Sequence, residues 1–109
     1  MTGLKAQPVE TSSGDVFELR TPERFVEWYW SVRRKPRSLG KAYAGAFARI
    51  DQWLADAGRD ERLLGGSLTG TQARALFESL RREKSFRALD AELSYICSDA
   101  MEEYVRWVE

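Results

Sequence analysis

One segment constrains the fold more than any other, because residues 38–58 place their large apolar side chains on a single helical face. These side chains recur every three or four positions. They are Leu39, Tyr43, Phe47, Ile50, Trp53, Leu54 and Ala57. Ser38 before the run is a typical N-cap, and Gly58 after it is a typical helix terminator. The pattern predicts an amphipathic helix that must bury one face against a partner, and its several alanines predict that a neighbour packs closely, with Gly45 a modest local cost to the helix.

A shorter helix is predicted before this segment. Thr21, Pro22 and Glu23 supply a capping hydroxyl, a proline suited to the first helical position and a carboxylate near the positive end of the helix dipole. Pro36 disfavours helical geometry at the residue before it, so this helix is predicted to end near Arg34. Its buried stripe is predicted to consist of Phe25, Trp28, Tyr29 and Val32.

The remaining half of the chain carries signals for two more helices. Thr69 and Gln72 form a capping-box pattern, which predicts a third helix that ends near Lys84. Residues 85–109 keep helical spacing and contain neither proline nor glycine, which predicts a fourth helix with a bend near its serines at 94 and 98.

These signals together predict an all-α fold, because no segment sustains the polar and apolar alternation of a strand. A chain of 109 residues with 43% apolar residues can bury one core. We therefore expect a single-domain four-helix bundle over residues 21–109. Residues 1–20 are rich in Gly, Pro, Ser and Thr, and they are predicted to form a flexible amino-terminal arm.

The composition excludes several kinds of chemistry. No apolar run reaches the roughly 18 residues of a membrane span, and the first residues lack a signal-peptide layout, so we expect a cytoplasmic protein that does not bind a membrane. The chain has no histidine and one cysteine, Cys97, which is predicted to be a small core residue. Asp51 and Asp56 diverge on a helix and are predicted to lie on a solvated face. We therefore expect no catalytic site, no cofactor and no metal.

The net charge of zero hides a segregation of charge along the chain. Residues 24–87 carry fourteen basic and seven acidic side chains, whereas residues 88–109 carry one and six. A first basic cluster, at the junction of the predicted first and second helices, consists of Arg33, Arg34, Lys35, Arg37 and Lys41. A second cluster, at the junction of the predicted third and fourth helices, consists of Arg81, Arg82, Lys84 and Arg87.

The two basic clusters favour binding of double-stranded DNA. In an up-and-down bundle both junctions lie at the same end, where they would form one electropositive surface for phosphates. Ser38 and the amino terminus of the second helix would add hydrogen-bond donors to that surface. A solvated charged surface that binds nothing is the alternative.

Two tryptophans favour a different function. Trp28, Tyr29 and Trp30 follow one another on a helix, so they cannot all face one core, and Trp30 is predicted to lie toward the surface, where it contacts a partner or packs against the amino-terminal arm. Trp107 is a similar candidate near the end of the chain. A protein partner or a second copy would then be recognised by Trp30, Trp107 and the acidic fourth helix.

The order of these features resembles the amino-terminal core-binding (SAM-like) domain of integrase-type tyrosine recombinases. The matching elements are Phe25-Val26-Glu27-Trp28, the serine-led helix from Ser38 to Leu54, the Leu68-Thr69 start and the segment from Ser85 to Tyr104. Residues 98–107 also resemble the helical DNA-recognition modules of restriction endonucleases. The recombinase catalytic domain has no counterpart here, so the resemblance implies a non-enzymatic, DNA-clamping module.

Overall fold

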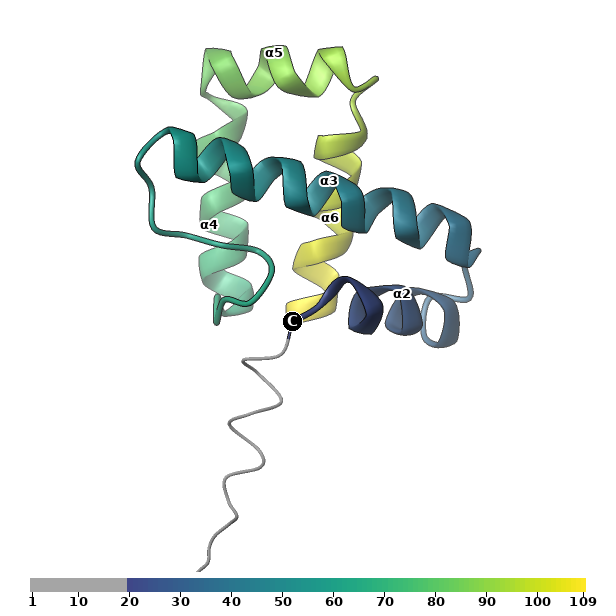
Figure 1. The fold of residues 1–109 in the computed structure, drawn as a ribbon. Coiled ribbons are helices and arrows are strands. Elements are labelled where there is room, and N and C mark those ends of the chain that lie inside the picture. The colour runs from purple at the N-terminus through teal and green to yellow at the C-terminus, as the bar shows by residue number, and fades with distance from the viewer. Residues whose placement is uncertain (1–19) are drawn as a thin grey trace, which may run out of the picture.

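The computed structural model describes residues 20–109, which form five helices and no strand (Figure 1). The helices are α2 (Pro22–Ser31), α3 (Arg37–Asp56), α4 (Gly70–Arg81), α5 (Lys84–Glu92) and α6 (Ile96–Val108). The all-α prediction is confirmed for this part of the chain. Apart from Arg20, the predicted amino-terminal arm lies outside the described residues.

Side-chain caps begin two of the helices where the sequence predicts them. The Thr21 hydroxyl accepts the N–H of Arg24 at 3.2 Å. Thr69 and Gln72 form a complete capping box. The Thr69 hydroxyl accepts the N–H of Gln72 at 3.1 Å, and the Gln72 side chain accepts the N–H of Thr69 at 2.8 Å. The prediction of Ser38 as a cap is wrong, because α3 begins at Arg37, after Pro36, without a side-chain cap.

The predicted fourth helix is two helices, so the count of four is wrong. Ser94 and Tyr95 have φ values of 58° and 66°, in the left-handed region that ends a helix. The N–H of Tyr95 donates to the carbonyl of Asp90 at 2.6 Å, which closes the last turn of α5. The chain then changes direction and continues as α6.

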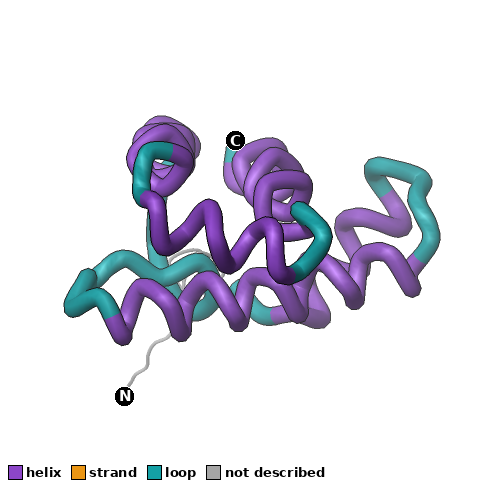
Figure 2. The backbone as a smooth tube through the Cα atoms, turned by 90° about the horizontal axis from the view of Figure 1, so that it is seen from above, coloured by secondary structure: helices purple, strands orange, loops and turns teal. Residues whose placement is uncertain are grey.

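The helices form two layers. α4 and α6 run in opposite directions in one layer, and α3 crosses both of them in the other (Figures 1 and 2). α2 folds back along the first part of α3, and α5 joins the upper ends of α4 and α6 in the view of Figure 1. Since α3 crosses its neighbours instead of running beside them, the described residues do not form the up-and-down order expected from the sequence.

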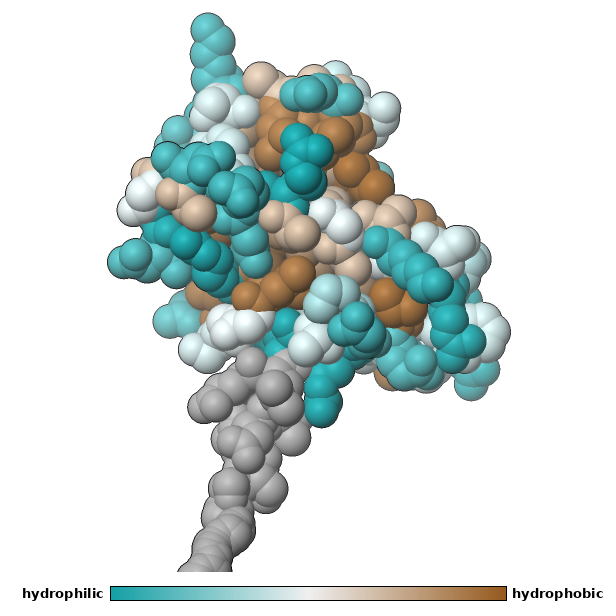
Figure 3. All heavy atoms as spheres, viewed as in Figure 1, coloured by the Kyte–Doolittle hydropathy of each residue, from teal (hydrophilic) through white to brown (hydrophobic). Residues whose placement is uncertain are grey.

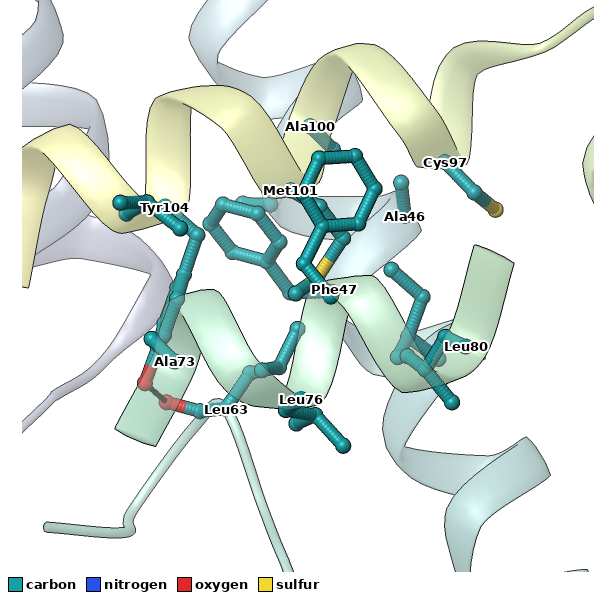
Figure 4. Close-up of a cluster of buried hydrophobic side chains, with 14 of the residues drawn as sticks. Ala46, Phe47, Leu63, Ala73, Leu76, Leu80, Cys97, Ala100, Met101 and Tyr104 are labelled. Carbon is teal, nitrogen blue, oxygen red and sulfur yellow. Dashed lines mark hydrogen bonds between the residues drawn. The ribbon is translucent and has the colours of Figure 1, made fainter. Parts of the chain in front are cut away.

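The core lies where α3 crosses α4 and α6 (Figure 4). Phe47 of α3, Leu76 of α4 and Met101 of α6 are buried there. Tyr104 is fully buried, and its hydroxyl donates a 2.7 Å hydrogen bond to the carbonyl of Leu63 in the segment between α3 and α4. The same tyrosine therefore fills the core and holds the connecting segment against it.

Asp51 holds the other side of this connecting segment. Its carboxylate accepts the N–H of Leu63 at 2.7 Å and the N–H of Leu64 at 3.0 Å. Burial raises the pKa of Asp51, although both N–H groups oppose the shift. The prediction of a solvated position is wrong for Asp51, because its carboxylate binds two backbone N–H groups of the connecting segment.

Candidate functional site

The α2–α3 corner, residues 30–41, gathers most of the large apolar side chains that the described residues expose. Trp30, Val32 and Leu39 are 47%, 63% and 38% exposed. The exposure of Trp30 confirms the prediction. The predicted burial of Val32 and Leu39 is wrong, because α2 ends at Ser31 and Leu39 lies in the first turn of α3, beyond the reach of the core.

Exposed cations belong to the same corner. Arg34, Lys35 and Lys41 are exposed, and none of them has a carboxylate partner among residues 20–109. Ser38 is also exposed, in the first turn of α3. The corner therefore offers both apolar and positively charged side chains to a partner.

Arg33 is held inside the domain. Its guanidinium binds the Glu103 carboxylate of α6 through two hydrogen bonds, of 2.9 Å from Nε and 3.1 Å from Nη2. Arg106 donates to the same carboxylate at 2.6 Å. Burial raises the pKa of Glu103, but the hydrogen bonds and charges of the two arginines outweigh it and hold the pKa below its ordinary value. This geometry does not favour Arg33 as a phosphate ligand, because its charge is already paired with Glu103 and two of its N–H groups are engaged there.

Arg37 links the two helices of the corner. Its guanidinium lies 4.6 Å from the centre of the Trp30 ring, and it also donates to Glu27 of α2 at 3.2 Å. Stacking of a guanidinium on an indole leaves the outer ring face and the ring edge for a partner. Arg37 thereby holds Trp30 in one place on the surface.

An apolar groove continues from the corner along the seam between α2 and α3. Its volume is about 550 Å³, and its lining combines two cations, Arg37 and Lys41, and two acids, Glu23 and Glu27, with small or apolar side chains. The apolar lining consists of Pro22, Val26, Ala44, Gly45 and Ala48. Figure 3 shows hydrophobic areas between charged side chains on the face of the molecule that α3 crosses.

The second basic cluster lies at the α4–α5 corner, away from the first. Arg81 binds Glu78 at 3.3 Å and lies over the ring of Phe77, and Arg87 donates to the carbonyl of Arg81 at 3.3 Å. Arg82 and Lys84 are exposed without a carboxylate partner among residues 20–109.

The two corners are on opposite sides of the molecule in both ribbon views (Figures 1 and 2). The prediction that they form one surface is wrong, because α3 crosses the other layer and carries the first corner away from the second.

The surface of α6 is acidic near its amino terminus. Tyr95, Asp99 and Glu102 are all exposed, and the two acids have no cationic partner among residues 20–109. Tyr95, which is 63% exposed, is a residue that the sequence analysis did not select. No local signal marks it, since its exposure results from the left-handed turn before α6.

Trp107 is a weaker candidate than Trp30. It is half-buried, and its ring packs edge-on against Phe25 at 5.3 Å and Tyr104 at 5.8 Å. Most of the Trp107 side chain is therefore covered by other residues of the same domain.

Within residues 20–109, no three metal-ligating side chains gather where they could hold an ion. Cys97 is buried as predicted, and burial, with the Asp90 charge, raises the pKa of its thiol to about 11. No helix of this part of the chain has both the length and the apolar character that a bilayer crossing requires.

The chain matches no family model, no curated protein and no solved structure. The resemblance to the core-binding domain of recombinases stays a prediction.

Proposed function

We propose that this chain is a non-enzymatic interaction module that binds an acidic partner protein with the α2–α3 corner. The observation that carries the proposal is the exposure of Trp30, Val32 and Leu39 among Arg34, Lys35 and Lys41. Contiguous apolar side chains on a surface are typical of binding sites, and tryptophan and arginine are the residues that most often dominate binding energy. The cations select a partner that carries negative charge.

Binding of double-stranded DNA is the second candidate. The observation that favours it is the set of exposed cations without a carboxylate partner in the described part of the chain. Those at the two basic corners are Arg34, Lys35, Lys41, Arg82, Lys84 and Arg87. Because these cations lie at two separate corners, each corner would contact phosphates on its own, with Ser38 beside the first. Few contacts per corner give weak, strongly salt-dependent binding.

A titration followed by backbone amide NMR separates the two candidates. One probe is a synthetic amphipathic helical peptide of glutamate and leucine, and the other is a short DNA duplex of random sequence. If the corner binds a partner protein, the peptide is expected to shift the amide signals of residues 30–41. Trp30→Ala is then expected to lower the affinity for the peptide by about tenfold, the usual loss at a dominant interface tryptophan. Trp107→Ala is the matched control if it remains folded, because Trp107 is mostly covered.

Other results contradict the proposal. If the duplex shifts both corners, loses affinity steeply with salt and is indifferent to Trp30→Ala, the DNA candidate replaces it. If neither probe shifts the signals of residues 30–41 at low salt, the α2–α3 corner is a solvated surface, and both candidates are lost.

A further inference from the structure

The large apolar side chains that residues 20–109 expose most fall in two places of opposite charge. Three of them, Trp30, Val32 and Leu39, lie at the basic α2–α3 corner. The fourth, Tyr95, begins an acidic surface on α6. One contact between these two places would cover all four side chains.

We infer that the acidic partner is a second copy of this chain, whose acidic face docks on the α2–α3 corner. The acidic face is defined by Tyr95, Asp99 and Glu102. This inference rests on the proposed function, because it names the partner of the same corner. It accounts for the segregation of charge in a chain whose net charge is zero.

The acidic face has a fixed shape. Asp99 and Glu102 are three residues apart, which is the spacing of one helical face, and Tyr95 precedes them at the N-cap of α6. Tyr95 is held at φ 66° by the bond from its N–H to the carbonyl of Asp90 at 2.6 Å. A tyrosine side chain has only two χ angles, so the cost of ordering it on docking is small.

The charges of the two surfaces are complementary and available. Asp99 and Glu102 have no cationic partner, and Lys35 and Lys41 have no carboxylate partner, among the described residues. Docking would therefore create ion pairs without breaking existing ones. The apolar side chains would contribute most of the affinity, and the charges would fix the orientation.

The proposed contact is heterologous, since different surfaces of the two copies meet. Each added copy leaves one free basic corner and one free acidic face, so the contact builds chains or closed rings instead of stopping at a dimer. A symmetric dimer, in which each copy uses the same surface, would stop at two. The average mass of the protein in solution therefore distinguishes the two arrangements.

The experiment uses sedimentation equilibrium of the full chain and two charge-reversed variants. Lys35→Glu with Lys41→Glu removes the basic corner, and Asp99→Lys with Glu102→Lys removes the acidic face. For the wild type we expect the average mass to rise beyond a dimer over about two decades of concentration and to fall with added salt. Each variant alone is expected to associate at least about tenfold more weakly.

The decisive sample is the equimolar mixture of the two variants. One variant keeps the acidic face and the other keeps the basic corner, so the mixture is expected to form a one-to-one dimer and nothing larger. Arg82→Glu with Lys84→Glu is the control, because it makes the same change of charge at the α4–α5 corner and should associate like the wild type. Trp30→Ser tests the corner independently if a charge-reversed variant does not fold.

Three outcomes overturn the inference. They are a wild type that stays monomeric at every concentration, a mixture that does not associate, and a control that is weakened as much as the corner variant. A monomeric wild type whose α2–α3 corner still binds the glutamate and leucine peptide overturns only the second copy as partner and leaves the proposed function standing. If the corner binds neither the peptide nor a second copy, both the inference and the proposed function are overturned.

Discussion

The carboxylate of Asp90 caps α6 from the end of α5, because its Oδ1 accepts the backbone N–H of Ser98 at 3.0 Å. Its Oδ2 accepts the hydroxyl of the same serine. Tyr95, the residue at the N-cap position of α6, makes no side-chain bond to the helix. Asp90 is only 7% exposed, so the cap is also a buried connection between two helices.

Replacement of Asp90 by alanine is expected to lower the free energy of unfolding by about 2 kcal/mol, because a cap is lost and a buried N–H is left without an acceptor. Urea unfolding followed by circular dichroism measures the change. Glu92→Ala is the control, since this exposed residue of α5 makes no ion pair within residues 20–109 and should change stability by less than about 0.5 kcal/mol. Equal effects of the two substitutions would show that Asp90 does not act as a cap.

The turn before α6 gives a prediction of opposite sign. Ser94 and Tyr95 have φ values of 58° and 66°, which glycine adopts at less cost than either residue. Ser94→Gly and Tyr95→Gly are each expected to raise the free energy of unfolding by about 1 kcal/mol. Urea unfolding followed by circular dichroism measures the change. Only Tyr95→Gly should weaken self-association, because Ser94→Gly leaves the tyrosine in place. Loss of stability in both variants would mean that the turn is not strained.

The features that the sequence predicted well depend on residues close together in the chain. Thr21 caps a residue three positions later, and Thr69 and Gln72 form their box within one turn, so local chemistry determines both helix starts. The stripe of α3 predicted its buried face, with Phe47, Ile50 and Leu54 all fully buried.

The features that the sequence did not predict depend on distant residues. Arg33 was selected as a phosphate ligand, but its partner Glu103 is 70 positions away, and no local pattern connects the two. The separation of the basic corners follows from the crossing of α3 over α4 and α6, which periodicity does not encode. Helical spacing also runs unbroken through Ser94 and Tyr95, so the pattern predicted only a bend near Ser94, where the structure ends one helix and begins another.

The Arg33–Glu103 pair predicts a pH-dependent effect. The folded state holds the pKa of Glu103 below the ordinary value of 4.5. The pair therefore contributes stability above that value, and the contribution is lost as pH falls through the lowered pKa of the folded state. Glu103→Gln is expected to cost about 1–2 kcal/mol at neutral pH, since one partner of a partly buried pair is removed, and less in acid.

Urea midpoints of the wild type and Glu103→Gln, compared at neutral pH and well below 4.5, measure this difference. Glu102→Gln is the neighbouring control, because Glu102 is exposed and has no ion pair in the described part of the chain. A cost of Glu103→Gln that stays the same in acid would contradict a charge-dependent role and would indicate that only the shape of the side chain matters.

Two glycines of α3 provide the last prediction, because the same substitution should have opposite effects at them. A Cβ at Gly40 would lie 3.2 Å from Cδ2 of Tyr29 and 3.5 Å from the backbone Cα of Val26, whereas a Cβ at Gly45 would meet nothing within 4 Å. Tyr29 cannot move aside, since its ring is stacked on Phe25 and lies edge-on to Tyr43.

Both substitutions gain the same helix propensity, so their difference isolates the packing of α2 on α3. Gly45→Ala is expected to raise stability by about 0.5–1 kcal/mol, and Gly40→Ala to lower it by about 1 kcal/mol because overpacking exceeds the propensity gain. Urea unfolding of the two variants measures both values, and a stabilising Gly40→Ala would mean that α2 is free to shift away from α3 at the base of the α2–α3 corner.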